Sequence, residues 1–382
     1  MKERKIVFVN QAVNFLTVDI VNSFTGKFDD ITLITGNVHT QGTELNSNIR
    51  LDRIIKYNEK SFATKSYTWS IATVQLFFKL LFKYRRHEVF FVSIPPMSYL
   101  TMLLLRNKFS ILIWDVYPDT LNIYGIGEGN PLFKFWAWAN RRIFKKATHL
   151  FTIGDKMAEL ISKYVDSNKI KIIRLWTTFE KFTPVKREEN FFVEEHQLQD
   201  KFVVQYSGNI GLIHNVEVMV DIAKLLKNNN RILFLVIGKG DKVNKIKDSI
   251  RECGLKNCLV LPFQPDDIFP YSLSAADMGV VILNSKTSKG SIPNKAYNLM
   301  TAGKPILYIA SKDSELHIYA DRYENGKCFE CSELQNIASF IEQLSGDIQL
   351  QQLYQANSIK ASLDFTRENT NAVIEVYQEL KS

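Results

Sequence analysis

The segment NSKTSKGSIPNKAYNLMTAGKPI, residues 284–306, lies between two apolar runs of the chain. The run before it, MGVVIL, is typical of a buried parallel strand. A loop rich in Gly, Ser and Lys then opens onto a helix predicted over 292–301, with Pro293 in its first turn. The N-terminus of a helix presents free backbone N–H groups and the positive end of the helix dipole. We therefore expect a phosphate group to bind here, with Lys289 and Lys295 adding positive charge.

Apolar runs alternate with helical patterns through the first half of the chain. The predicted strands cover 6–9, 31–35, 89–93, 109–114 and 148–153. The helical patterns cover about 12–24, 67–86, 97–106, 131–146 and 155–165. Strands that alternate with helices predict a doubly wound parallel sheet.

A charged stretch, 180–200, interrupts this alternation and predicts a linker or surface loop. The alternation then restarts, with strands over 202–206, 232–237, 258–261, 279–283 and 306–309 and helices near 215–228, 241–252, 292–301 and 333–344. The chain thus predicts an α/β fold of two Rossmann-like domains, 1–183 and 184–366. Ligands of such sheets bind beyond the carboxyl ends of the strands, so we expect a site in a cleft that both domains face.

The net charge of +8 is unevenly distributed along the chain. Residues 1–183 carry 26 Lys/Arg and 15 Asp/Glu, a net of +11, whereas residues 184–382 have a net of −3. A basic half can meet nucleic acid, an anionic membrane surface or an anionic substrate. No run of about 20 apolar residues is present, and the N-terminus enters a strand directly, so we expect neither a membrane span nor a signal peptide.

Four cysteines, Cys253, Cys258, Cys328 and Cys331, lie in the second half. The C-x2-C spacing of the last two raises zinc or redox chemistry. The first two form an irregular C-x4-C pair, which suits a zinc site poorly. We therefore expect reduced, structural cysteines, no metal site and a reducing compartment, the cytoplasm.

Two glycine loops follow the first two strands of the second domain, SGNIG at 207–211 and GKG at 238–240. Glycine permits a tight turn and a close approach of the backbone to a ligand. For each loop alone, an ordinary turn between strand and helix explains the glycines about as well. The NAD fingerprint G-x-G-x-x-G is absent at both places.

The combination of SGNIG, IGKG and SIPNKAYNLMTAGKP, in this order in one domain, resembles the retaining nucleotide-sugar glycosyltransferases of the GT-B fold, in the large family often called glycosyltransferase family 4. The resemblance covers essentially the whole chain, and its specific part is 202–345. It implies that the second domain binds a nucleotide diphosphate sugar, a UDP-sugar, as co-substrate, with no cofactor and no metal. It also implies that the helical pattern at 369–380, within a segment 367–382, crosses back to the first domain.

In that family the first glycine loop approaches the diphosphate, the residues after the third strand hold the base, and the helix before A-G-K-P meets the ribose and phosphates. The positions that this implies for donor binding are Gly208, Asn209, Gly211, His214, Gly238, Lys239, Phe263, Gln264, Ser291, Pro293, Asn294, Lys295 and Asn298. Members often carry two glutamates eight positions apart, where this chain has Gly290 and Asn298. Asn298 still bonds a ribose hydroxyl, though without charge assistance.

Many members also carry an Arg and a Lys near the first glycine loop, where this chain has Asn209, His214 and Asn215. The charge of the phosphates then falls more heavily on Lys295, with Lys239 or Lys289 helping. The alternative for Lys295 is a solvated lysine on a helix.

Two segments resemble the branch that acts on lipid-linked sugars in bacterial surface polysaccharide pathways. One is S-x-P-x-K at 291–295, and the other is WDVYPDTL at 114–121, which is similar to a D-x-W-P-E/D segment. Asp115 would contact the acceptor hydroxyl or act as a base. The alternative is a carboxylate that caps the following turn. No pair of catalytic carboxylates is evident, but front-face retaining transfer needs positioning and charge stabilisation, to which Lys295 contributes.

Two helical patterns of the first half, 69–86 and 131–146, mix aromatic with basic residues. Such helices can lie at an anionic bilayer interface. For either helix alone, a core-facing helix with a solvated basic edge is the simpler explanation, but the charge of +11 favours peripheral membrane contact. No signature of an RNA-binding module is present, so we expect no nucleic acid partner.

We therefore expect a retaining glycosyltransferase that moves a sugar from a UDP-sugar to a hydroxyl of a polyprenyl-linked or other glycan acceptor at the cytoplasmic face of the membrane. A nucleotide-sugar epimerase of the same fold would need paired catalytic acids. A partner subunit that has lost catalysis is kept open by Gly290 and Asn298. A nucleic-acid-binding module is disfavoured by the acidic second half.

Overall fold

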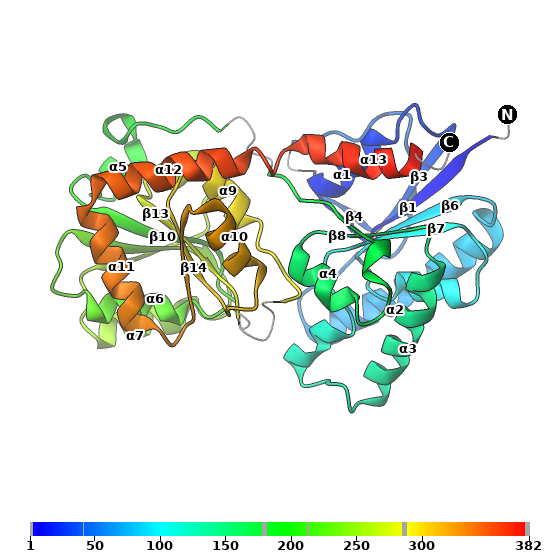
Figure 1. Ribbon diagram of the computed structural model, residues 1–382, viewed down its shortest axis with the longest axis horizontal. Coiled ribbons are helices and arrows are strands. Elements are labelled where there is room, and N and C mark those ends of the chain that lie inside the picture. The colour runs from blue at the N-terminus through cyan, green and yellow to red at the C-terminus, as the bar shows by residue number, and fades with distance from the viewer. Residues whose placement is uncertain (1–2, 41, 178–181, 212–213, 285–288, 379–382) are drawn as a thin grey trace. The chain divides into compact units, whose positions relative to one another are not determined.

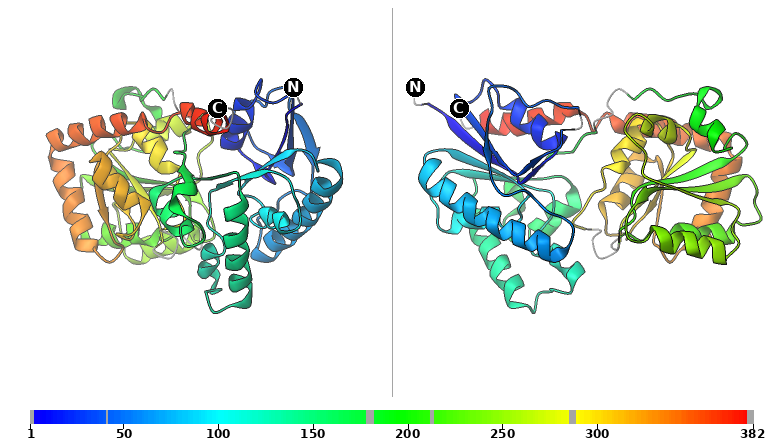
Figure 2. Two further views of the ribbon diagram at one scale, coloured as in Figure 1. Left: turned by 45° about the vertical axis from the view of Figure 1, so that its right-hand side comes forward. Right: turned by 180° about the vertical axis from the view of Figure 1, so that it is seen from behind.

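The computed structural model describes residues 3–40, 42–177, 182–211, 214–284 and 289–378. It divides into two compact units (Figure 1). The first unit is Met1–Thr178 with Arg367–Ser382, and the second unit is Phe179–Thr366. Each unit is a parallel sheet with helices on both faces (Figure 2). The division falls close to the boundary expected at 183.

The sheet of the first unit has seven parallel strands in the order β5-β3-β1-β6-β7-β8-β9. Their bounds are β1 Lys5–Val9, β3 Asp30–Thr35, β5 Arg50–Arg53, β6 Glu88–Val92, β7 Phe109–Ile113, β8 His149–Thr152 and β9 Ile170–Ile172. Two short strands, β2 Ala12–Val13 and β4 Asn37–Val38, pair separately. The strand order reverses between β1 and β6, so ligands are expected at the carboxyl ends of these strands.

Helices of the first unit lie on both faces of its sheet, with α1 and α13 on one and α2 and α3 on the other (Figures 1 and 2). Their bounds are α1 Phe15–Ser23, α2 Phe62–Phe78, α3 Pro131–Lys146, α4 Asp155–Ile161 and α13 Thr370–Gln378. A π-helical turn, Lys79–Lys83, continues α2. The helix expected at 67–86 begins earlier because Ser61 and Thr64 form a capping box. The helix expected at 97–106 is a 3-10 helix, Ser98–Leu103.

The sheet of the second unit has six parallel strands in the order β12-β11-β10-β13-β14-β15. Their bounds are β10 Phe202–Asn209, β11 Ile232–Lys239, β12 Cys258–Leu261, β13 Met278–Ile282, β14 Ile306–Ile309 and β15 Gly326–Phe329. The order again reverses between the first and the fourth strand along the chain, β10 and β13. The two sheets therefore share one winding pattern.

The helices of the second unit include four that the sequence did not predict, α5, α8, α10 and α12. The bounds are α5 Phe191–Glu195, α6 Glu217–Leu225, α7 Val243–Glu252, α8 Phe269–Ser274, α9 Lys295–Thr301, α10 Glu315–Tyr323, α11 Leu334–Gly346 and α12 Ile348–Ser362. The stretch 180–200 is thus partly helical, and its residues 180 and 181 lie outside the described residues, as do 285–288 of the opening segment. Pro293 was expected inside the first turn of a helix, but α9 begins at Lys295.

The last helix, α13, belongs to the first unit, although it follows the whole second unit in the chain. The Tyr377 hydroxyl donates to Ser110 Oγ at 2.6 Å. Its ring packs against Phe24 and Phe90, which are completely buried. The core of the first unit is therefore completed by a segment from the far end of the sequence.

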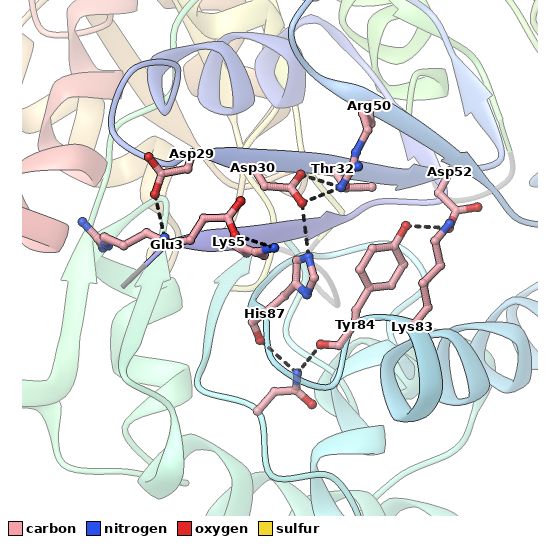
Figure 3. A network of polar contacts seen from close by, with 12 residues as sticks. Glu3, Lys5, Asp29, Asp30, Thr32, Arg50, Asp52, Lys83, Tyr84 and His87 are labelled. Atoms are coloured by element: carbon pink, nitrogen blue, oxygen red, sulfur yellow. Dashed lines mark hydrogen bonds and ion pairs between the residues drawn. The ribbon is translucent and has the colours of Figure 1, made fainter. Parts of the chain in front are cut away.

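A polar network covers the edge of the first sheet at β5, which lacks an apolar run (Figure 3). Arg50 pairs with Asp30 on the neighbouring strand. Asp52 accepts from Lys79 Nζ at 2.6 Å, from Lys83 Nζ at 3.0 Å and from the Tyr84 hydroxyl at 2.7 Å. These contacts fasten the edge strand to the end of α2.

Candidate functional site

Glycine is required at the carboxyl end of β10, where the first predicted loop lies. Gly208 has a φ of +150°, and a Cβ atom there would lie 2.7 Å from Lys295 Nζ. Gly238 is its partner on β11, and a Cβ at Gly238 would meet the carbonyl oxygen of Gly208. Gly240 has a φ of +147°, and a Cβ there would lie 2.5 Å from the backbone of Ile210. The glycines of both loops therefore allow two strands and a lysine to meet.

Lys295, the first residue of α9, lies with its side chain against this loop. Its ammonium lies 3.7 Å from the centre of the Tyr206 ring, a cation–π contact. Protein groups surround the ammonium, although part of the side chain remains accessible, and burial lowers the pKa of Lys295 to about 7. No carboxylate pairs with it within the described part of the chain. The alternative of a solvated lysine on a helix therefore does not describe Lys295.

A pocket of about 50 Å³ lies beside Lys295. Its lining is Gln205, Ser207, Lys295 and Asn298 with the apolar Phe269, Leu273, Val280 and Leu299. Both amide atoms of Gln205 are buried and have no hydrogen-bond partner among the residues that the structure covers. Because buried polar groups are almost always bonded, this pocket suits water or a small polar group of a ligand. The sequence analysis missed Gln205, whose signal was a polar residue within the apolar run FVVQY.

His214 lies close to the same loop. Its Nδ1 is 3.6 Å from the position of a Cβ on Gly211. Burial first, and then the positive charges of Lys295 and Lys242, lower the pKa of His214. Lys242 itself donates to the carbonyl oxygen of His214 at 3.0 Å and pairs with Glu217. His214 is therefore neutral near pH 7 and adds a polar group, not a charge.

The other predicted donor residues form a separate group at the ends of β11 and β12. The Lys239 ammonium lies 5.1 Å from the centre of the Phe263 ring, which is half exposed. Gln264 Nε2 donates to the carbonyl oxygen of Pro262 at 2.8 Å. Lys289, expected to add charge at the phosphate, is paired with Asp313 instead. A half-exposed aromatic ring beside a cation can stack a nucleobase.

Ser291, Pro293 and Asn294 occupy the chain between β13 and α9. Asn294 stands at the N-cap position, but its side chain makes no capping hydrogen bond. The segment delivers Lys295 to the glycine loop, while Asn298 lies one turn further along α9 and lines the pocket.

In the first unit, Asp115 follows β7 at the carboxyl edge of the sheet. Its side chain is solvent-accessible, yet protein groups crowd the carboxyl, and desolvation raises the pKa of Asp115 to about 6, with Lys65 opposing this shift. No hydrogen bond to the carboxylate comes from the residues that the structure describes, so Asp115 does not cap the following turn. Asp119, by contrast, accepts from the Tyr164 hydroxyl at 2.5 Å.

A cluster of aromatic side chains, Tyr57, Trp69 and Tyr117, belongs to the same unit as Asp115. Tyr57 stacks on Trp69 with ring centres 6.2 Å apart, and Tyr117 meets Trp69 edge-on at the same distance. Burial first, then the charges of neighbouring groups that include Asp115, raise the pKa of Tyr57 to about 12. Aromatic faces beside a carboxylate suit a sugar, which offers apolar C–H faces and hydroxyl donors.

No group of three His, Cys, Asp or Glu side chains able to hold a metal ion occurs in the described ranges. The four cysteines are free, and burial raises the pKa of Cys258 and Cys328 to about 12. Within those same ranges, no helix has both the length and the apolar character needed to cross a bilayer.

Two parallel-sheet Rossmann-like units of this winding are the architecture of GT-B glycosyltransferases. The crystal structure of HepE from Anabaena, in complex with UDP and glucose, matches 99% of this chain and 100% of that chain with a TM-score of 0.73. At 14% sequence identity, this likeness shows the fold alone.

The family model described as Glycosyl transferases group 1 matches residues 186–361. The second unit is therefore a glycosyltransferase group 1 domain. Among curated relatives, WbjE of Pseudomonas aeruginosa, named as a probable glycosyltransferase, is 28% identical over 66% of this chain and 64% of its own length. WcaI of Escherichia coli strain K12, whose name assigns it to colanic acid biosynthesis, is 22% identical over 58% and 56%. The match spans less than two thirds of either relative.

Proposed function

We propose that this protein is a glycosyltransferase of bacterial surface polysaccharide synthesis. It transfers a sugar from a UDP-sugar to a hydroxyl of a lipid-linked glycan acceptor, with retention of configuration. The observation that carries the proposal is the ammonium of Lys295 beside Gly208, where the strand order of the second sheet reverses. Among the residues that the structure describes, no carboxylate pairs with it.

The second unit supplies the donor site in this proposal. The diphosphate of the donor contacts the backbone at Gly208 and the ammonium of Lys295, and the base stacks on Phe263. HepE, which shares the fold, was crystallised with UDP, and this supports a uridine nucleotide. Asn298 bonds a ribose hydroxyl in place of the glutamate of related enzymes.

Lys295 also serves the chemical step. When the bond between sugar and diphosphate breaks, negative charge grows on the leaving UDP, and a fixed cation in a partly dry site stabilises it. No protein nucleophile is required, because in front-face transfer the leaving diphosphate takes the proton of the acceptor hydroxyl. Asp115, ionised at neutral pH, accepts a hydrogen bond from that hydroxyl and positions it.

Peripheral contact with an anionic membrane belongs to the same proposal. Helix α3 exposes Leu132, Phe135 and Trp138, each more than 40% accessible, together with Arg141 and Arg142. The end of α2 and its π-helical turn expose Phe78 and Phe82, which stack on each other. Exposed aromatic side chains together with basic ones suit the interface of an anionic bilayer, and this would place the protein at the cytoplasmic face.

Titration with a panel of nucleotides and nucleotide sugars tests the donor proposal. We expect heat of binding and a thermal shift with UDP, and slow release of UDP from one UDP-sugar. The Lys295→Met variant should lose most of both signals, whereas Lys289→Met should keep them because Lys289 pairs with Asp313. No response to any uridine or guanosine nucleotide would sink the proposal.

The same experiment separates the alternatives. A nucleotide-sugar epimerase would convert the donor without an acceptor. A subunit that has lost catalysis would bind UDP-sugar tightly without turnover in the presence of acceptor. Gly290 and Asn298, which stand where related enzymes often carry glutamates, keep this alternative open.

Membrane contact is tested by sedimentation with vesicles. We expect binding to vesicles with about 30% anionic lipid and little binding to neutral ones. A double variant, Phe135→Ser with Trp138→Ser, should lose it, while Phe263→Ser, an exposed aromatic residue of the second unit, should not. Equal sedimentation of both variants would contradict the contact.

A further inference from the structure

A second pocket, of about 530 Å³, lies at the outer end of the first sheet. Its lining is Gly36, Asn37, Val38, His39, Arg53, Ile54 and Lys56. These residues follow β3 and end or follow β5, so the pocket opens at the carboxyl edge of the sheet, as Asp115 does after β7. The donor and acceptor residues described above do not include any of them.

The two walls of this pocket are fastened to each other. Asn37 Nδ2 donates to the carbonyl oxygen of Tyr57 at 3.2 Å, and the Tyr57 N–H donates back to Asn37 Oδ1 at 3.1 Å. Gln11, from the loop after β1, donates from Nε2 to the carbonyl oxygen of Ile55 at 3.1 Å. A Cβ on Gly36 would collide with that same carbonyl oxygen. The pocket is therefore a formed feature of the fold and needs no rearrangement to exist.

Three cationic or titratable side chains of the pocket, His39, Arg53 and Lys56, are exposed and have no ion pair within the described residues. Their neighbours are paired instead: Arg50 with Asp30, and Lys83 with Asp52 (Figure 3). Lys79 pairs with Asp52 as well. The excess positive charge at this edge of the sheet thus faces the pocket.

We propose that this basic pocket binds an oxyanion carried by the acceptor, a phosphate, a diphosphate or a carboxylate. The inference rests on the proposed function. A guanidinium matches two oxygens of such a group at once, and an ammonium and an imidazole beside it add further donors. Solvent access lets the remainder of the acceptor extend out of the pocket.

The pocket also fixes where the charge sits on the acceptor. Four inter-strand intervals separate β5 from β7 in the sheet, or about 19 Å at roughly 4.8 Å each. The oxyanion would therefore lie at most about 20 Å from a hydroxyl held at Asp115. This span admits an anionic glycan whose charge lies on a neighbouring sugar unit or on its lipid diphosphate.

The test uses the full chain with the donor site saturated by UDP, so that added anions do not bind there. Inorganic pyrophosphate, glucuronic acid and neutral glucose are titrated by calorimetry. We expect the double variant Arg53→Gln with Lys56→Gln to bind the two anions about tenfold more weakly or worse, since two charge-assisted contacts are lost. Binding of UDP should not change.

The matched control is Arg85→Gln with Arg86→Gln, two exposed arginines of the same unit outside the pocket. This control removes the same net charge and should leave binding of the anions unaltered. Stronger binding of pyrophosphate than of glucuronic acid supports the lipid diphosphate as the source of the charge, and the reverse order supports a charged sugar. Equal affinity of the two double variants, or no anion binding by the UDP-saturated wild type, would overturn the proposal.

Failure of the donor proposal would be seen separately, as absent UDP binding. The anion titration is then repeated without UDP in the Lys295→Met background, where only the pocket of the first unit is tested.

Discussion

The ammonium of Lys295 lies 3.7 Å from the centre of the Tyr206 ring and 2.7 Å from the place where a side chain on Gly208 would begin. It is held by an aromatic face and not by a carboxylate. No opposite charge among the described residues offsets the cost of burying this ammonium, so the neutral form is favoured and burial lowers the pKa of Lys295 to about 7.

Binding of UDP at pH 8 should therefore take up a proton. The free lysine is largely neutral at that pH, and a diphosphate beside it favours the charged form. We expect the calorimetric binding enthalpy to differ between Tris and HEPES buffers for the wild type, and affinity for UDP to fall as pH rises above about 7. Lys295→Met should show neither effect, while Lys239→Met should keep both.

The rate of sugar transfer should fall about 10²–10³-fold in Lys295→Met when UDP-sugar is saturating, because a fixed charge that stabilises the leaving group is lost. Initial rates at saturating donor measure this loss. Lys304→Met is not a suitable control, because the Lys304 ammonium donates to two carbonyl oxygens of the second unit. Lys289→Met is the matched control. A loss confined to KM would contradict a role in the chemical step.

Asp115→Asn should lower transfer about 10²-fold while leaving UDP binding intact, because the carboxylate acts on the acceptor. Its pKa of about 6 places ionisation just below neutrality, so the wild-type rate should rise with pH through about 6 and level off near 7. The variant should lack this rise. Asp119→Asn, which removes the partner of Tyr164, should retain it.

Gly238→Ala should destabilise the second unit by about 1–3 kcal/mol, since the new methyl group meets the backbone of Gly208 and not a movable side chain. Urea denaturation followed by fluorescence measures the change. Gly346→Ala is the matched control, because nothing lies within 4 Å of its Cβ position. Similar midpoints for the two variants would show that β10 and β11 tolerate a wider separation.

Asp52→Asn should cost the first unit about 1–3 kcal/mol at neutral pH, because Lys79, Lys83 and Tyr84 lose a charged acceptor. Burial raises the pKa of Asp52, but these hydrogen bonds outweigh it and hold the pKa at about 2. A lowered pKa stabilises the fold above the unfolded value near 4, and this contribution is lost as pH falls toward 2. The gap between variant and wild type in urea midpoint should therefore close between pH 4 and pH 2.

The sequence predicted both sheets because most of their strands are short apolar runs between helical patterns. It missed three edge strands, β5, β9 and β15. The residues of β5, RLDR, have no apolar run, and the strand is held by ion pairs of Arg50 with Asp30 and of Asp52 with Lys79. The helix expected at 97–106 is a 3-10 helix, and no local pattern distinguished the two.

Only those residues of the candidate site that belong to local motifs could be predicted from the sequence. Gly208, Gly238 and Lys295 belong to local motifs that a sequence displays. Gln205 and Tyr206 acquire their roles only because α9 returns over the end of β10, which no nearby spacing reveals. Lys289 was expected to bind the phosphate, but it forms an ion pair with Asp313, a residue of another loop.

The position of α13 has a consequence for how the protein is made. A ribosome finishes every residue of the second unit before Tyr377 emerges. Phe24 and Phe90 therefore lack the packing of the Tyr377 ring until the end of α13 has been made. The unit that begins translation is thus the last to be completed, and the later unit has the earlier chance to fold. Until α13 emerges, the nascent first unit lacks this cover over Phe24 and Phe90, and a chaperone would be expected to act there.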